Sequence, residues 1–166
     1  MGSSRVRAFL HWLPAALAVL MIALESTVFM SANNTSRWLL PVWERLFGPI
    51  SPGHWSVVHE GIRKTGHFTG YGLVSICFFH GFRTTLRAVD GLHRLWVRSA
   101  IFALGCTILI ASADELHQAF LPNRGGSPLD VALDTCGAIT ALLIVLFLMP
   151  RLARKPSASL SGSFAE

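Results

Sequence analysis

The stretch that decides the fold is residues 111–137, ASADELHQAFLPNRGGSPLDVALDTCG. Both of its flanks are apolar, with residues 96–113 running into it and residues 138–149 following it. Four carboxylates lie within it, namely Asp114, Glu115, Asp130 and Asp134. A carboxylate between two long apolar runs is costly inside a membrane, so four of them together indicate a functional polar site.

The composition of the whole chain favours a membrane protein over a soluble one. The 166 residues suffice for one domain, and 52% are hydrophobic while 14% are charged, against about 25% charged residues in soluble domains. The formal net charge is +5, but the basic residues form no continuous stripe, so no nucleic-acid partner is expected. Cys77, Cys106 and Cys136 all lie in apolar runs, which predicts small core residues and no disulfide framework.

The hydrophobic pattern predicts an all-α, polytopic membrane protein with four transmembrane helices. A helix needs about 20 apolar residues to cross a bilayer core of about 30 Å. The predicted spans are residues 8–29, 63–82, 96–119 and 128–149. The first span follows Arg5 and Arg7 and also resembles a secretory signal peptide, but Glu25 and the length of the apolar run favour a retained helix.

The connection between the first two spans, residues 30–62, is predicted to contain an outer amphipathic helix at residues 36–47. Apolar and aromatic side chains recur there at helical spacing. Such a helix either lies flat in the membrane interface or packs as a lid on the bundle. Glycine and proline at residues 48–53 predict a break before the second span. The serine-rich residues 151–166 are predicted to form a disordered cytoplasmic tail.

The distribution of charge predicts that both termini are cytoplasmic. With the N-terminus inside, nine of the 14 Lys and Arg residues and two of the nine acidic residues fall on the inner side. The outer side then carries five basic and seven acidic residues, membrane-embedded groups included. Basic residues concentrate on the cytoplasmic side of membrane proteins, so the predicted topology is N-in and C-in.

This topology brings polar side chains of all four spans to one level, in the outer half of the membrane. Glu25 closes the first span, and the polar residues of the other three spans share a helix face within each span. We therefore predict one partly hydrated cavity, open to the outer side. The predicted ligand-binding residues are Lys64, His67, Tyr71, Asp114, Glu115, Gln118, Arg124, Ser127, Asp130 and Asp134.

Several of these residues also have a local structural interpretation. Residues 127–130, SPLD, are typical of a helix N-cap followed by proline, so Asp130 is either part of a cap or a ligand. Arg124 either snorkels to solvent, bridges the carboxylates, or contacts a ligand. Glu25 is a candidate ion-pair partner of Lys64 or Arg63. Small side chains predict close helix approach at Gly66, Gly70 and Gly72.

The polar residues also form an ordered pattern. It starts with Arg63-Lys64-x-x-His67-x-x-x-Tyr71 and continues with Asp114-Glu115-x-x-Gln118-x-Phe120-x-Pro122-x-Arg124-x-x-Ser127-x-x-Asp130-x-x-x-Asp134-x-x-Gly137. Over roughly residues 20–147 this pattern resembles the VanZ-like family, small bacterial membrane proteins named for a teicoplanin-resistance accessory protein. The family often has Asn at the position of Asp134.

The resemblance implies a multi-pass protein of the bacterial cytoplasmic membrane, linked to the cell envelope, with residues 1–150 as one VanZ-like membrane domain. Some members of the family are associated with reduced susceptibility to lipid-bearing glycopeptides such as teicoplanin. The family brings no agreed biochemical activity with it.

Three functions are compatible with these residues. The favoured one is a binder at the outer leaflet, in which Lys64 and Arg124 meet the anionic headgroup of a membrane lipid, a cell-wall precursor or a lipoglycopeptide. The second is a membrane-embedded enzyme, with Asp114 or Glu115 as general base and His67 as acid. The third, proton- or ion-coupled transport, is disfavoured because the polar groups form no path through the inner half.

No cofactor and no metal site are expected. Asp114 and Glu115 are adjacent, and neighbouring side chains on a helix diverge by about 100°, so the two are not expected to share one ion. The sequence leaves the oligomeric state and the identity of the ligand open.

Overall fold

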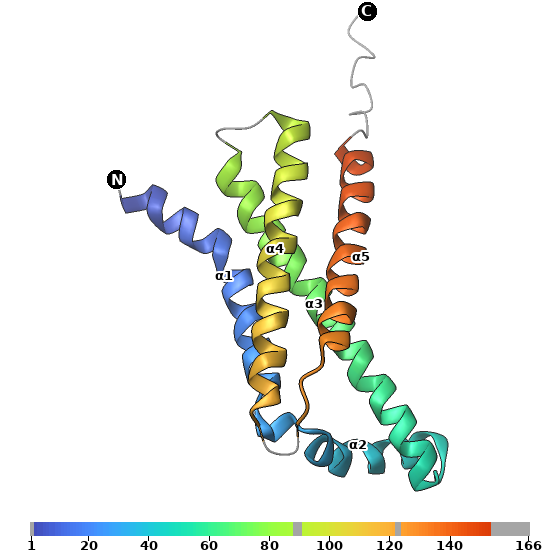
Figure 1. Cartoon of the computed structure of the whole chain (residues 1–166). Coiled ribbons are helices and arrows are strands. Elements are labelled where there is room, and N and C mark those ends of the chain that lie inside the picture. The colour runs from blue at the N-terminus through green and yellow to red at the C-terminus, as the bar shows by residue number, and fades with distance from the viewer. Residues whose placement is uncertain (1, 88–90, 122–123, 154–166) are drawn as a thin grey trace, which may run out of the picture.

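The computed structural model describes residues 2–87, 91–121 and 124–153, and every regular element in these ranges is a helix (Figure 1). Helix α1 spans Gly2–Glu25 and is followed by the 3-10 turn η1 (Val28–Met30) and helix α2 (Ala32–Phe47). The three helices α3, α4 and α5 span Pro52–Leu86, Leu92–Ala119 and Pro128–Ala153. The all-α prediction is confirmed for the described chain.

Helix α3 is the central element of the bundle, because it packs against α1, α4 and α5. The start of α1, the ends of α3 and α5 and the start of α4 lie at one end of the bundle (Figure 1). Helix α2 and the α4–α5 connection lie at the opposite end. The two ends of the described chain therefore lie on the same side of the bundle, as a topology with four crossings requires. Which of the two sides faces the cytoplasm stays a prediction.

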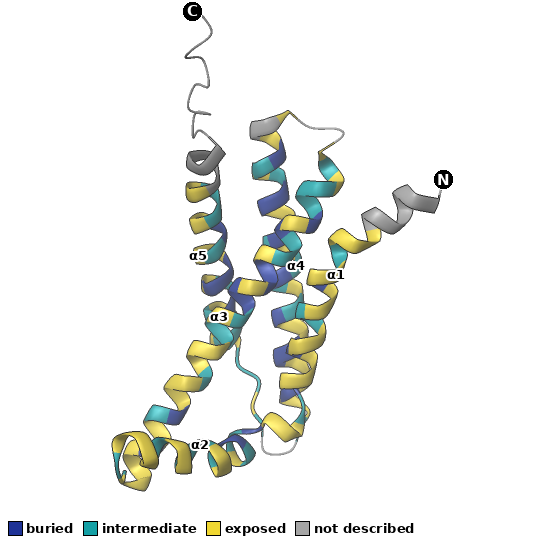
Figure 2. Cartoon of the chain, turned by 180° about the vertical axis from the view of Figure 1, so that it is seen from behind, coloured by how far each residue is buried: buried dark blue, intermediate teal, exposed yellow. Residues whose placement is uncertain are grey.

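Two described helices are long and apolar enough to cross a membrane, over Arg94–Ala119 and Pro128–Leu148. Only 28% and 22% of their most apolar windows are buried, whereas a core helix of a soluble protein is mostly buried. Exposed residues follow the outer faces of the bundle (Figure 2), including Leu109 and Leu129, which are 71% and 79% exposed. This surface indicates a membrane protein, while the prediction of four spans stays a prediction.

The structure corrects several predicted boundaries. Helix α1 ends at Glu25 and not at residue 29, because the Thr27 backbone and hydroxyl both donate to the Leu24 carbonyl. Helix α2 begins at Ala32, four residues before the predicted start, with Ser31 at its N-cap. Helix α5 continues to Ala153, so residues 151–153 of the predicted tail are helical, and residues 154–166 lie outside the described residues.

The largest correction concerns the start of α3, at Pro52 instead of residue 63. Gly48 ends α2 with a φ of 89°, and Ser51 then caps α3 by accepting a hydrogen bond from the His54 backbone N–H at 3.4 Å. Pro52 fits the first turn because no N–H is needed there. With 35 residues, α3 reaches about 52 Å at 1.5 Å per residue, which carries it past the bundle to α2 (Figure 1).

One face of α2 packs on this extension of α3. Trp55 donates its indole N–H to the Ser36 hydroxyl at 2.7 Å, and the Thr35 hydroxyl lies 3.0 Å from His59 Nε2. Helix α2 also exposes apolar side chains, including Val42 and Leu46, which are 54% and 70% exposed. Both features are expected of an amphipathic helix that lies in a membrane interface, and that location stays a prediction.

Small residues bring α3 and α5 close together in the core. A Cβ atom at Gly72 would lie 3.3 Å from the Gly137 carbonyl oxygen and 3.3 Å from Ala141 Cβ. The predicted close approach is therefore right at Gly72, but it is wrong at Gly66, where no neighbouring atom lies within 4 Å of a Cβ.

The three described cysteines are free thiols, as predicted. Cys77 and Cys106 are half-buried. Cys136 is exposed, so its prediction as a core residue is wrong, because it faces outward from α5 among the exposed apolar side chains.

The predicted topology has a direct test in reporter fusions. Fusions of green fluorescent protein after Arg87 and after Arg154 should fluoresce, because that protein folds only in the cytoplasm. A fusion of alkaline phosphatase after Asn33 should be active, because this enzyme needs the outer side. A green fluorescent protein fusion after Arg154 that stays dark, together with an active alkaline phosphatase fusion at the same position, would contradict the four-helix topology.

Candidate functional site

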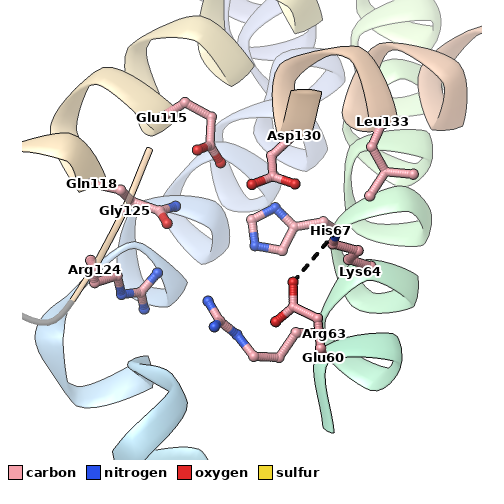
Figure 3. A pocket seen from close by; sticks show the side chains of 10 residues that line it. All are labelled: Glu60, Arg63, Lys64, His67, Glu115, Gln118, Arg124, Gly125, Asp130 and Leu133. Atoms are coloured by element: carbon pink, nitrogen blue, oxygen red, sulfur yellow. Dashed lines mark ion pairs between the residues drawn. The ribbon is translucent and has the colours of Figure 1, made fainter. Parts of the chain in front are cut away.

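A polar cavity of about 220 Å³ lies beside α3, at the level where α4 ends and α5 begins (Figure 3). Helix α3 contributes four of its lining residues, at the i, i+3, i+4 and i+7 positions of one helix face. The cavity is lined by Glu60, Arg63, Lys64, His67, Glu115, Gln118, Arg124, Gly125, Asp130 and Leu133.

Six of the ten predicted ligand-binding residues line this cavity, namely Lys64, His67, Glu115, Gln118, Arg124 and Asp130. Tyr71, Asp114 and Asp134 are buried and do not line it. Ser127 holds the first turn of α5. The structure therefore brings most of the predicted residues together, in two layers: an open layer around the cavity and a buried layer beside it.

Asp114 belongs to the buried layer and is engaged by two neutral donors. The Tyr71 hydroxyl and the Gln118 side-chain amide both donate to its Oδ2 atom, each at 2.9 Å. Tyr71 is 0% exposed and Asp114 is 9% exposed. Asp114 thus joins α3 to α4 in the core and does not line the polar cavity. Of the three residues considered for acid–base chemistry, only Glu115 and His67 line that cavity.

Glu115 and Ser127 together hold the start of α5. The Ser127 hydroxyl accepts a hydrogen bond from the Leu129 backbone N–H at 3.1 Å, which is the predicted N-cap. The Ser127 backbone N–H donates to Glu115 Oε2 at 2.9 Å. The carboxylate at the cap therefore comes from α4, while Asp130 lines the cavity.

Arg124 ties the α4–α5 connection to the end of α1. Its Nη2 atom donates to the carbonyl oxygens of Glu25 and Thr27, at 2.5 and 2.7 Å. Its Nε atom is buried and has no hydrogen-bond partner among the described residues. Burial lowers the pKa of the guanidinium, and the nearby charge of Arg63 lowers that pKa further. Arg124 thus binds backbone carbonyls, not the carboxylates that the bridging alternative assumed.

The Lys64 ammonium has a different partner from the one considered in the sequence. It lies 3.6 Å from a Glu60 oxygen one helical turn earlier, with both side chains about half exposed. Exposed pairs of this kind contribute about 0–1 kcal/mol. Lys64 is therefore free to exchange this partner for a ligand at little cost.

His67 connects the open layer to the buried layer. Its Nδ1 atom lies 3.4 Å from Asp134 Oδ1, and its ring centroid is 6.1 Å from that of Tyr71. Asp134 is 0% exposed, and neither of its oxygens has a hydrogen-bond partner among the described residues. An unbonded carboxylate at such a position is costly, which makes Asp134 the least satisfied group of the site.

Four lining residues were not among the predicted ligand-binding residues: Glu60, Arg63, Gly125 and Leu133. Helical spacing identifies two of them, since Arg63 and Glu60 precede His67 and Lys64 by one turn on the same face. Glu60 was missed because the predicted span began at residue 63, which left the preceding turn outside the helix.

A sequence model of the family described as VanZ/LLP1 matches residues 9–149. The match extends from the first apolar turn of α1 nearly to the end of α5, and it includes every residue of the cavity and of the buried layer. No curated protein and no solved structure matches the chain. The family match agrees with the resemblance carried by the polar pattern, and the chain belongs to the VanZ/LLP1 family.

Proposed function

We propose that this protein binds a single anionic group, a phosphate or a carboxylate on an envelope lipid, cell-wall precursor or lipoglycopeptide, in the cavity beside α3. The observation that carries the proposal is the pair of guanidiniums, Arg63 from α3 and Arg124 from the α4–α5 connection (Figure 3). Guanidinium groups suit bidentate binding of carboxylate and phosphate.

The electrostatics of the two arginines support this proposal. The charge of Arg63 is one cause, after burial, of the lowered pKa of Arg124. The like charges therefore repel each other. An anion held between them would convert this repulsion into two attractive contacts. The buried Nε of Arg124, which has no hydrogen-bond partner in the described part of the chain, offers a further donor.

The other charges of the cavity limit the ligand to one acidic group. Arg63, Lys64 and Arg124 are balanced by three carboxylates, Glu60, Glu115 and Asp130. A polyanion would meet these carboxylates and be repelled. A volume of about 220 Å³ accepts a headgroup but not a whole lipid or antibiotic, since pockets for drug-sized ligands measure about 300–1,000 Å³.

We place the proposed binding site on the outer side of the membrane. The cavity lies at the end of the bundle that the charge distribution predicts to face outward, in the bacterial cytoplasmic membrane. A site there meets outer-leaflet headgroups. Binding of such a group is also a route by which the protein would lower susceptibility to teicoplanin-type antibiotics.

Arg63→Gln should weaken anion binding tenfold or more, because a charge-assisted hydrogen bond contributes about 1.5–3 kcal/mol. The melting temperature of purified protein is measured in nanodiscs with inorganic phosphate, with phosphatidylglycerol replacing phosphatidylcholine, and with teicoplanin. These three arms separate free phosphate, lipid and lipoglycopeptide. Arg63 is the residue to change, because Arg124 also holds the end of α1.

The matched control is Arg45→Gln, which removes an arginine from α2 outside the cavity. Its melting shifts should equal those of the wild type. Equal shifts of wild type and Arg63→Gln with all three anions would contradict the proposal.

The contact between His67 and Asp134 favours a second candidate, acid–base chemistry on the same headgroup. Asp134 would orient the imidazole, and Glu115 would act as the base. Release of a product from phosphatidylglycerol by the wild type, but not by His67→Gln, would distinguish such an enzyme from a binder.

A further inference from the structure

Three side chains from three helices converge at the junction of the two layers: His67 of α3, Glu115 of α4 and Asp134 of α5. One donor atom from each lies within 4.8 Å of the other two. We propose that these three residues bind one divalent transition-metal ion of the Zn²⁺ or Mn²⁺ type. The proposal goes beyond headgroup binding and does not depend on it.

Asp134 carries the argument for a cation. It is 0% exposed, and both of its oxygens have no hydrogen-bond partner in the described chain. A buried carboxylate without donors is strongly destabilising unless a positive charge accompanies it. His67 at 3.4 Å is the nearest basic group among the described residues, and its Nδ1 has no hydrogen-bond partner among them either. A metal ion between the two would satisfy both atoms at once.

The donor set indicates the class of ion. One imidazole nitrogen with two carboxylate oxygens suits Zn²⁺ or Mn²⁺ better than the all-oxygen sites of Ca²⁺ and Mg²⁺. Ligand atoms around an ion with bonds of about 2.0–2.2 Å lie about 3–3.5 Å apart. The His67–Asp134 separation of 3.4 Å already has this value. Since its donor atom lies within 4.8 Å of the other two, Glu115 has to approach by at most about 1.8 Å to reach this spacing, which a side-chain rotation supplies.

Neighbouring contacts hold the three ligands in place. Glu115 uses Oε2 to accept the Ser127 N–H, and a carboxylate has a second oxygen to offer an ion. The His67 ring packs near Tyr71, whose hydroxyl is fixed by Asp114. Such outer contacts orient metal ligands in known sites. His67 and Glu115 also line the cavity, so water reaches the same position.

The sequence argument against a shared metal ion considered only Asp114 and Glu115. Asp114 and Glu115 do diverge, as the helical geometry predicted, since Asp114 bonds Tyr71 and Gln118 while Glu115 bonds Ser127. The second carboxylate of the proposed site is Asp134, which comes from a different helix. Only the packing of α5 against α3 places it beside His67.

The test uses full-length protein purified without a polyhistidine tag, treated with EDTA and then dialysed against Zn²⁺ or Mn²⁺ with no anionic lipid present. Bound metal is measured by inductively coupled plasma mass spectrometry, and stability by thermal melting. The wild type should bind one ion per chain and melt at a higher temperature when loaded. Asp134→Asn and His67→Gln should each weaken the affinity tenfold or more.

Glu44→Gln is the control, because it also removes one carboxylate charge, but from α2, outside both the cavity and the group of three. It should bind the ion as the wild type does. A wild type that binds no stoichiometric metal would overturn the proposal. So would a Glu44→Gln protein that loses as much affinity as Asp134→Asn, or a folded Asp134→Asn protein that binds the ion normally. If Asp134→Asn does not fold, Glu115→Gln decides, since it keeps an acceptor for Ser127 and should also lose the ion.

Discussion

Gly137→Ala should lower the free energy of unfolding by about 3 kcal/mol, the upper part of the usual range for overpacking. A Cβ atom at this position would overlap the Phe68 carbonyl oxygen of α3 and also crowd its Cα. A side chain could rotate away from an added methyl group, but helix backbone has no such freedom. The only relief is to move α5 away from α3, which also separates His67 from Asp134.

Unfolding of the purified protein in detergent measures this effect. The matched control is Gly105→Ala in α4, where no atom lies within 4 Å of the added Cβ. This control should be neutral or up to about 1 kcal/mol more stable, because alanine is a better helix former than glycine. Equal stabilities for the two variants would show that α3 and α5 do not approach as closely as described.

Gly126→Ala should have the second-largest effect, a loss of about 2–3 kcal/mol together with loss of the site. The added Cβ would overlap the Glu115 carbonyl oxygen of α4. The α4–α5 connection has to move away from α4 to relieve this overlap. Ser127 then leaves the Glu115 carboxylate, and Arg124 is pulled from the end of α1. Binding of both phosphate and Zn²⁺ should fall in this one variant.

The neighbouring glycine provides the control. Gly125 is adjacent in the chain, yet a Cβ there has no atom within 4 Å. Gly125→Ala should therefore keep the wild-type melting temperature to within a few degrees. Thermal melting of both variants, followed by phosphate and Zn²⁺ titrations of Gly126→Ala, completes the comparison. A Gly126→Ala protein with wild-type stability and binding would contradict the described packing of the connection.

The sequence was sufficient wherever local chemistry sets the structure. The start of α5 at Pro128 was predicted to the residue, because Ser127 and Pro128 form an N-cap whose side-chain hydrogen bond is local to the segment. The end of α4 at Ala119 followed from the end of its apolar run. The start of α3 was predicted 11 residues too late, because that prediction used hydropathy alone. Hydropathy marks the part of a helix that lies in lipid, whereas Ser51 and Pro52 begin this helix three turns earlier, in a polar segment.

The level of the site was also determined by the sequence. Residues such as His67, Glu115 and Asp134 occupy set distances along their helices, and each apolar run sets how its helix is placed across a membrane. A shared depth therefore followed from the chain alone. The face of each helix followed as well, since 3.6 residues per turn places residues one turn apart on the same side.

Only the tertiary structure decided which of these groups meet. Gly72 and Gly137 let α5 approach α3 closely, and this approach puts Asp134 against His67 while Glu115 reaches them from α4. The same packing turns Asp114 into the core and leads Arg124 to the carbonyls of α1. Depth and face are properties of one helix and can be counted along the chain. The rotation of each helix and its distance from the next depend on side chains of several helices packing together, which no single stretch of sequence contains.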